Sequence, residues 1–213
     1  MSMHDEVLSA AKDMLRLGLT AGTSGNVSGR LDGGHFVITP SSVSYEDMTL
    51  SDLVVIDGAG EVVEGTLRPS SERAVHLACY HAYEEINSVI HAHPLYASMF
   101  ACAHEPIPAV IDEFAVYVGG AVPCTEYAMS GTPTLAESAA ASVQGVGTAL
   151  LANHGTVTVS SSPAKALHQL GVVERAAQII WGARLLGSLS ELPEETNKLL
   201  TAYYTRLRHA PEE

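Results

Sequence analysis

Two histidines placed two residues apart, His91 and His93, follow the apolar residues 89–90. The apolar pair indicates a buried β-strand, in which every second side chain points to the same face. Both imidazoles would then lie side by side on a rigid backbone and could bind one zinc ion with little rearrangement. The pattern favours a metal-binding pair, and a hydrogen-bonded structural pair is the alternative.

His154 is a third candidate ligand, because it stands in a predicted turn between two apolar runs and is followed by Gly155. Catalytic zinc sites commonly use three protein ligands and leave one position open. A hairpin turn with a hydrogen-bonded imidazole explains the same pattern. Structural or surface roles are expected for the remaining histidines, which stand in polar or terminal segments or on predicted helices: His4, His35, His76, His81, His104, His168 and His209.

Ser70, Ser71 and Glu72 stand where a helix is expected to begin. Free amide groups and the helix dipole favour an anion at such a place. In one interpretation the two serines hold a phosphate and Glu72 points into the site. A carboxylate beside a divalent cation can serve as a ligand or as a base. The other interpretation is an ordinary helix N-cap.

Two further turns, at residues 22–28 and 39–42, are rich in small residues and hydroxyls. Small residues expose main-chain amides, which is typical of anion-binding loops. The formal net charge of −13 argues against a nucleic-acid partner, and it also opposes an anionic substrate. A phosphate-bearing substrate would therefore need a local nest of donors. The cations expected nearby are Arg30, Arg68 and Arg73.

Apolar periodicity predicts an α/β fold with a largely antiparallel sheet. The length of 213 residues suits a single domain, residues 1–213. Residues 107–123 are expected to be mostly extended. The expected strands are 35–39, 53–56, 61–64, 89–93, 149–152 and 156–159, and the main helices begin near residues 7, 70, 94, 132, 162 and 193.

The sequence contains no apolar run of membrane-spanning length and does not open like a secretory signal. Its three cysteines, Cys79, Cys102 and Cys124, are odd in number and are not spaced as zinc ligands. We therefore expect buried thiols in a reducing compartment, and a cytoplasmic protein.

The ordered set of motifs resembles the class II aldolase and adducin head family, and within it the fuculose phosphate aldolases. Any one of these motifs is a weak signal, but their common order is specific. The resemblance covers nearly the whole chain and rests on GTSGNVS at 22–28, ITPSS at 38–42, DLVVID at 52–57, PSSE at 69–72, HAHP at 91–94, YAMSG at 127–131 and NHG at 153–155.

The resemblance implies a central antiparallel sheet flanked by helices and a zinc ion held by His91, His93 and His154. It also implies that Glu72 is the acid–base residue and an additional metal ligand before substrate binds. The implied reaction is the reversible cleavage of a ketose phosphate to dihydroxyacetone phosphate and a small aldehyde. The implied assembly is a homotetramer with active sites at subunit interfaces. The residues implied to hold the substrate phosphate are Gly25, Asn26, Ser41, Ser42, Ser70 and Ser71.

A second acid–base residue is less clear from the resemblance. The family has a tyrosine after its second histidine motif, but the matching segment here carries Asp112 and Glu113, with Tyr117 at a shifted spacing. A C-terminal tyrosine of the family corresponds to Tyr203 or Tyr204, and Tyr204 is the better placed. The identity of the sugar is therefore open.

Several other functions fit parts of the same pattern. Epimerases, dehydratases and decarboxylases of sugar phosphates use the same kind of metal site. A non-catalytic adducin-like module would share the fold but lack the histidines and Glu72. A zinc hydrolase would use the metal ligands but would leave the three donor-rich turns unexplained.

Overall fold

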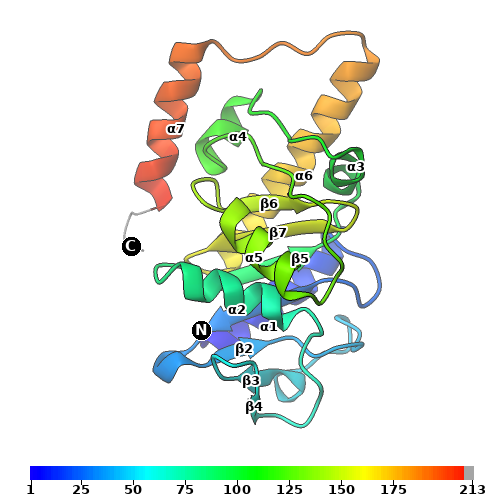
Figure 1. Ribbon diagram of the computed structural model, residues 1–213, viewed down its shortest axis with the longest axis vertical. Helices are drawn as coiled ribbons and strands as arrows, with labels where there is room; N and C mark the ends of the chain where they lie inside the picture. Colours follow the sequence, from blue (N-terminus) through cyan, green and yellow to red (C-terminus); the bar gives the residue numbers. More distant parts are fainter. Residues whose placement is uncertain (209–213) are drawn as a thin grey trace.

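Seven strands form one sheet in the computed structural model, which describes residues 1–208 (Figure 1). Residues 209–213, which include His209, lie outside the described part. Each neighbouring pair is antiparallel, in the order β4-β3-β2-β1-β5-β7-β6, which confirms the predicted fold class. The strands are β1 (Asn26–Arg30), β2 (Phe36–Ile38), β3 (Val54–Ile56), β4 (Val62–Glu64), β5 (Ser88–Ala92), β6 (Thr148–Leu151) and β7 (Gly155–Ser160).

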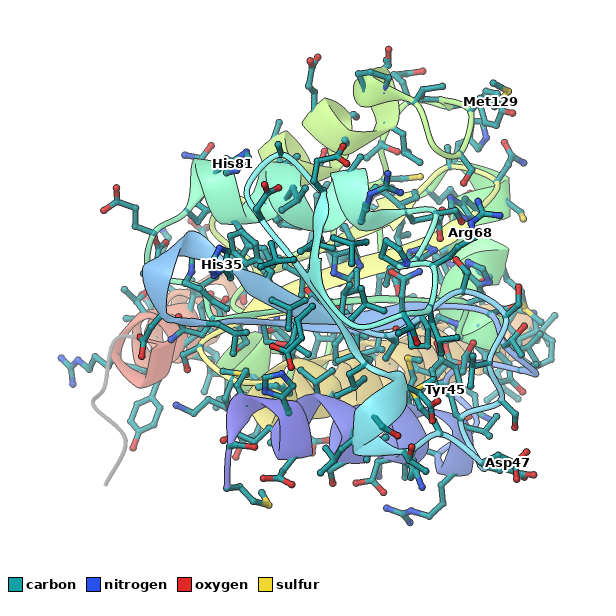
Figure 2. All side chains as sticks on the ribbon, turned by 90° about the horizontal axis from the view of Figure 1, so that it is seen from below. His35, Tyr45, Asp47, Arg68, His81 and Met129 are labelled. Atoms are coloured by element: carbon teal, nitrogen blue, oxygen red, sulfur yellow. The ribbon has the colours of Figure 1, made fainter. Side chains whose placement is uncertain are left out.

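Helices cover both faces of this sheet (Figures 1 and 2). Among the described residues, none of the helices is both long and apolar enough to cross a membrane. The helices are α1 (Met3–Arg16), α2 (Arg73–Ala82), α3 (Leu95–Ala103), α4 (Asp112–Tyr117), α5 (Pro133–Ser142), α6 (Pro163–Leu185) and α7 (Glu194–Arg208), with short 3-10 turns at Asp32–Gly34 and Leu50–Asp52.

Alternation along the central strands divides the core into two layers. Val89 of β5 packs with α2 and α5, whereas its neighbour Ile90 packs with α1 and α6 on the opposite face. Strand β5 is buried along its whole length and is paired on both edges, with β1 and with β7. The backbone at the end of β5 is therefore held by both neighbouring strands and by the core around it.

The N-terminal helix α1 and the long helix α6 pack against the same face of the sheet, although they lie far apart in the sequence. Ser162 caps α6 by accepting a hydrogen bond from the Lys165 amide, and a proline follows at the first helical position. Thr132 caps α5 in the same way. These two helix starts confirm the starts predicted from the sequence.

Three local predictions were wrong. Residues 26–28, expected in a donor-rich turn, form the start of the central strand β1. The segment expected to be extended contains the short helix α4, in which Phe114 and Ala115 are buried against α6 and α7. Asp112 and Glu113 lie in its first turn, where acidic side chains interact favourably with the helix dipole. The prediction of buried thiols holds for Cys79, but Cys102 is exposed.

Gly155 is the position in this sheet where a side chain would do most harm near the end of β5. A Cβ atom there would lie 2.4 Å from the Ala92 carbonyl oxygen. We expect Gly155→Ala to lower the free energy of unfolding by about 1–3 kcal/mol, because main chain cannot move away cheaply. Urea denaturation measures this value. Gly182→Ala on α6 is the control: its Cβ would meet nothing within 4 Å, so an equal loss there would contradict the steric explanation.

Candidate metal and active site

Four side chains converge at the end of β5: Glu72, His91, His93 and His154. One possible ligand atom from each lies within 4.8 Å of those from the others. Glu72 stands at the N-cap of α2, His91 lies in β5, His93 follows that strand, and His154 lies in the turn between β6 and β7. The four residues come from three separate segments of the chain, so only the tertiary structure assembles them.

Strand pairing brings the His154 turn to this place. Ala92 of β5 pairs with Thr156 of β7, so the turn before β7 lies beside the residue that follows β5. Asn153 in that turn has a φ of 54°, a left-handed conformation that asparagine tolerates better than most residues. The two strands approach closely because Gly155 has no side chain.

The orientation of His91 follows from its hydrogen bond. Its Nδ1 lies 2.8 Å from the Thr156 carbonyl oxygen, which can only accept, so Nδ1 carries the proton. In the neutral ring, Nε2 then has a lone pair. That atom lies 2.9 Å from Glu72 Oε2 and 3.0 Å from His93 Nε2.

The donor set fits a divalent cation of the zinc type. Lone-pair atoms facing each other at such distances repel unless a positive charge lies between them. Three imidazole nitrogens and one carboxylate form a common ligand set for zinc and for related transition metals. The Thr156 carbonyl that fixes the His91 ring is the kind of partner that orients a metal-binding histidine.

The charge states also suit a cation. Burial alone would raise the pKa of Glu72, but positive charge on the His91 side and a hydrogen bond from Ser130 lower that pKa well below the usual value. With His91 neutral, a bound cation would provide the positive charge beside Glu72. Burial lowers the pKa of His93 to about 4 and also lowers the pKa of His154. A carboxylate and neutral imidazoles are the forms that bind metal ions.

Glu72 occupies the N-cap position of α2, but its side chain forms no cap hydrogen bond with that helix. Its two oxygens are instead held from several directions. Ser130 Oγ donates to Oε1 at 2.7 Å, Asn26 Nδ2 donates to Oε2 at 3.3 Å, and His154 Nε2 lies 3.3 Å from Oε1. The role of Ser130 was missed, because no local pattern links it to Glu72.

A polar cavity of about 180 Å³ adjoins the four donors. Glu72 and His93 belong to its wall, so the cavity opens directly onto the donor cluster. The structure brings all the residues expected to hold phosphate to this wall: Gly25, Asn26, Ser41, Ser42, Ser70 and Ser71.

Hydrogen-bond donors remain available in this wall. Ser42 and Ser71 use neither their main-chain N–H nor their hydroxyl in a hydrogen bond with another described residue. Ser41 and Ser70 are engaged instead: Ser41 Oγ donates to the Pro69 carbonyl and Ser70 Oγ accepts from the Glu72 amide. Ser41 and Ser70 therefore shape the cavity, whereas Ser42 and Ser71 keep donors available in its wall.

Figure 2 labels Tyr45, Arg68 and Met129, which lie on the side of the view away from His81. Tyr45 donates its hydroxyl to the Gly25 carbonyl at 2.6 Å, which holds the first donor-rich turn. The Arg68 carbonyl accepts from the Ser41 amide at 2.9 Å, which holds the second turn. Met129 precedes Ser130.

The candidates for a second acid–base residue lie elsewhere in the chain. Tyr204 packs its ring against Gly119 and lines a cavity with Tyr117 and His168 that includes none of the four donors. Glu113 lines a different cavity, of about 650 Å³, beside α1 and α6. Asp112 is exposed beside it on α4. Within one copy of the chain, none of these residues lines the cavity beside Glu72.

Comparison with known proteins gives a consistent result. The Class II Aldolase and Adducin N-terminal domain model matches residues 5–181. The chain is 37% identical over 174 residues to an L-fuculose phosphate aldolase of Escherichia coli O6:H1, covering 82% of this chain and 80% of that protein. It is 34% identical to an L-ribulose-5-phosphate 4-epimerase of Salmonella paratyphi B over 224 residues, covering 98% and 96%.

The fold comparison agrees. A solved L-fuculose 1-phosphate aldolase superimposes with a TM-score of 0.89 at 36% identity, covering 95% of this chain and 96% of that one. A family match over most of the chain and a relative above 30% identity show common descent. The chain therefore belongs to the class II aldolase and adducin family and is an enzyme of the class II aldolase type.

Proposed function

We propose that this enzyme is a zinc-dependent aldolase that reversibly cleaves a ketose phosphate of the fuculose phosphate type into dihydroxyacetone phosphate and a small aldehyde. One observation carries the proposal: the four metal-type donors and the donor-rich cavity share a wall at Glu72 and His93. A phosphate bound in that cavity would leave the adjoining carbons of a small sugar beside the donor cluster.

His91, His93 and His154 would hold the zinc ion, and Glu72 would complete the set before substrate binds. When bound, the cation would polarise the substrate carbonyl and make the neighbouring C–H bond more acidic. As neutral ligands, the three imidazoles would leave the positive charge of the ion uncompensated.

Glu72 would carry the proton in both directions. In condensation its carboxylate takes a proton from the carbon beside the carbonyl of dihydroxyacetone phosphate, and that carbon forms the new bond to the aldehyde carbon. In cleavage the bond between these carbons breaks, and the carbon retained by dihydroxyacetone phosphate takes the proton back from Glu72. Ser130 and Asn26 hold the carboxylate in place through the hydrogen bonds described above.

The phosphate would be bound without help from overall charge, since the net charge of −13 repels anions. Main-chain N–H groups and hydroxyls of Gly25, Asn26, Ser42 and Ser71 would provide the local donors. Ser41 and Ser70 would keep the cavity in shape.

The second proton, on the aldehyde oxygen, would be handled by Tyr204. Because Tyr204 lies on α7, apart from the four donors of its own chain, it would act at the site of another copy of the chain. The proposed assembly is a homotetramer with active sites at subunit interfaces. The three free thiols suit a reducing compartment, and we place the enzyme in the cytoplasm as one domain of residues 1–213.

Epimerisation of a ribulose phosphate is the second candidate function. The observation in its favour is the epimerase relative, which aligns along 98% of the chain. Such a reaction would return a sugar of unchanged length and release no dihydroxyacetone phosphate, so the products distinguish the two functions.

The function is tested by adding fuculose, rhamnulose and ribulose phosphates to the enzyme with and without a chelator. We expect dihydroxyacetone phosphate to be released from at least one, to stop after chelation and to return with added zinc, because the cation activates the carbonyl. A coupled dehydrogenase assay detects the release. A zinc-loaded enzyme that releases none but changes the sugar's stereochemistry would replace the aldolase proposal with the epimerase one.

Glu72→Gln keeps the size of the side chain but removes its charge and its ability to take a proton. We expect kcat to fall by roughly 10²–10⁴-fold, the usual contribution of a general acid–base group. Steady-state kinetics at saturating zinc measure the change. Glu84→Gln, at the exposed end beyond α2, is the matched control and should retain full activity. Wild-type turnover by Glu72→Gln would remove Glu72 from the mechanism.

His93→Ala removes one of the proposed zinc ligands. We expect a zinc content well below one ion per chain after dialysis, because two histidines and a carboxylate hold the ion less tightly than the full set. Elemental analysis measures the content. His81→Ala removes an exposed histidine of α2 and should leave it unchanged (Figure 2). Stoichiometric zinc in His93→Ala would contradict the ligand assignment.

A further inference from the structure

A chain of buried hydrogen bonds runs from Glu72 into the layer between β1 and α2. Asn26 Nδ2 lies 3.3 Å from Glu72 Oε2, and Asn26 Oδ1 forms a very short hydrogen bond with His76 Nε2. His76 Nδ1 lies 2.6 Å from Ser28 Oγ, which lies 2.8 Å from the Tyr80 hydroxyl. The four residues behind Glu72 are each at most 4% exposed.

The side-chain repeats of strand β1 and helix α2 bring these residues together. Asn26 and Ser28 are two residues apart in β1, so they point to the same face of the sheet. His76 and Tyr80 are four residues apart in α2, so they lie on the same side of the helix. That side of α2 packs against that face of the sheet, and the four polar groups pair with one another there.

The direction of every hydrogen bond in the chain follows from its last member. The Glu72 carboxylate can only accept, so Asn26 must present its amide nitrogen to it and its carbonyl oxygen to His76. That oxygen can only accept, so His76 Nε2 carries the proton. In the neutral imidazole Nδ1 is then an acceptor, so Ser28 must donate to it and in turn accept from Tyr80.

The neutral form of His76 agrees with its surroundings. Complete burial lowers the pKa of His76 to about 3. Four successive donors therefore point toward a carboxylate. Such bonds polarise one another in a buried environment, and the last of them ends on a charged acceptor.

We propose that His76 is a positioning residue, which through Asn26 fixes the Glu72 carboxylate in the orientation needed to move the substrate proton. The inference rests on the proposed function for what Glu72 does, but the hydrogen-bond chain itself does not depend on it. It also gives the Asn26 side chain a role of its own. Because its amide is engaged by His76 and Glu72, Asn26 would meet the substrate phosphate mainly through its main chain.

The direction of the chain can be tested without any substrate. Long-range ¹H–¹⁵N correlation spectra of the histidine rings show which nitrogen carries the proton. We expect His76 in the zinc-loaded wild-type protein to be neutral with the proton on Nε2, and we would assign its signals by their loss in His76→Gln. A proton on Nδ1 would reverse the chain, direct it away from Glu72 and overturn the proposal.

The effect on Glu72 is measured by exchange of a carbon-bound proton of dihydroxyacetone phosphate with D₂O, in the absence of aldehyde. At saturating zinc we expect His76→Leu to slow this exchange by about 10–100-fold, as is typical when a residue behind a ligand is removed. His76→Gln can still donate to Asn26 and should recover part of the rate. The KM for dihydroxyacetone phosphate should stay the same in both variants.

Tyr80→Phe provides a milder test in case His76→Leu does not fold. It removes only the hydroxyl at the far end and keeps the ring stacked on Phe36. We expect a roughly two- to tenfold slower exchange, the range for loss of one hydrogen bond. Tyr83→Phe is the matched control, since its hydroxyl donates to the Ala140 carbonyl at 2.9 Å, outside the chain. Its exchange rate should equal that of the wild type.

The possible outcomes separate the two proposals. Slow exchange in Tyr80→Phe and partial rescue by His76→Gln, with normal zinc content and KM, support the positioning role. Wild-type exchange in a folded His76→Leu or in Tyr80→Phe overturns it. If the wild-type enzyme exchanges no proton of dihydroxyacetone phosphate, the aldolase proposal fails, and the ring-proton measurement alone decides whether the chain points to Glu72.

Discussion

The antiparallel pairing of β5 on both of its edges is the constraint on which the site depends. Pairing with β1 sets Asn26 opposite His91, and pairing with β7 places the His154 turn beside His93. Because β5 is also buried on both faces, its backbone cannot shift to relieve repulsion among the ligand atoms. The protein therefore holds four groups together that would separate in a flexible chain, and a bound cation would compensate for that strain.

Helix α2 links the metal-type donors to the substrate cavity. Its N-cap residue Glu72 belongs to both, and the buried face of the helix continues the hydrogen bonds of Glu72 through His76 and Tyr80. One element thus provides the acid–base group of the proposed mechanism, its orientation and part of the phosphate cavity. In the proposed mechanism, the second acid–base residue, Tyr204, would come from another copy of the chain.

Much of the fold followed from local patterns. The apolar residues 89–90 predicted a buried strand, and the spacing of His91 and His93 predicted that both lie on one face of it. The caps at Thr132 and Ser162 predicted two helices. The short helix α4 did not follow, because its apolar residues read equally well as a strand. Its helical form is decided by packing against α6 and α7, which lie about fifty or more residues further along the chain.

By itself the sequence determined the kinds of chemistry available: His-x-His on a strand, a third histidine in a turn, and a glutamate behind two serines. It also determined the need for a local anion site, through the net charge of −13. Only the tertiary structure decided that Ser130 reaches Glu72 and that His76 faces Asn26. The reason is physical: local patterns fix which face a side chain occupies, whereas strand register and helix packing fix which distant atom it meets.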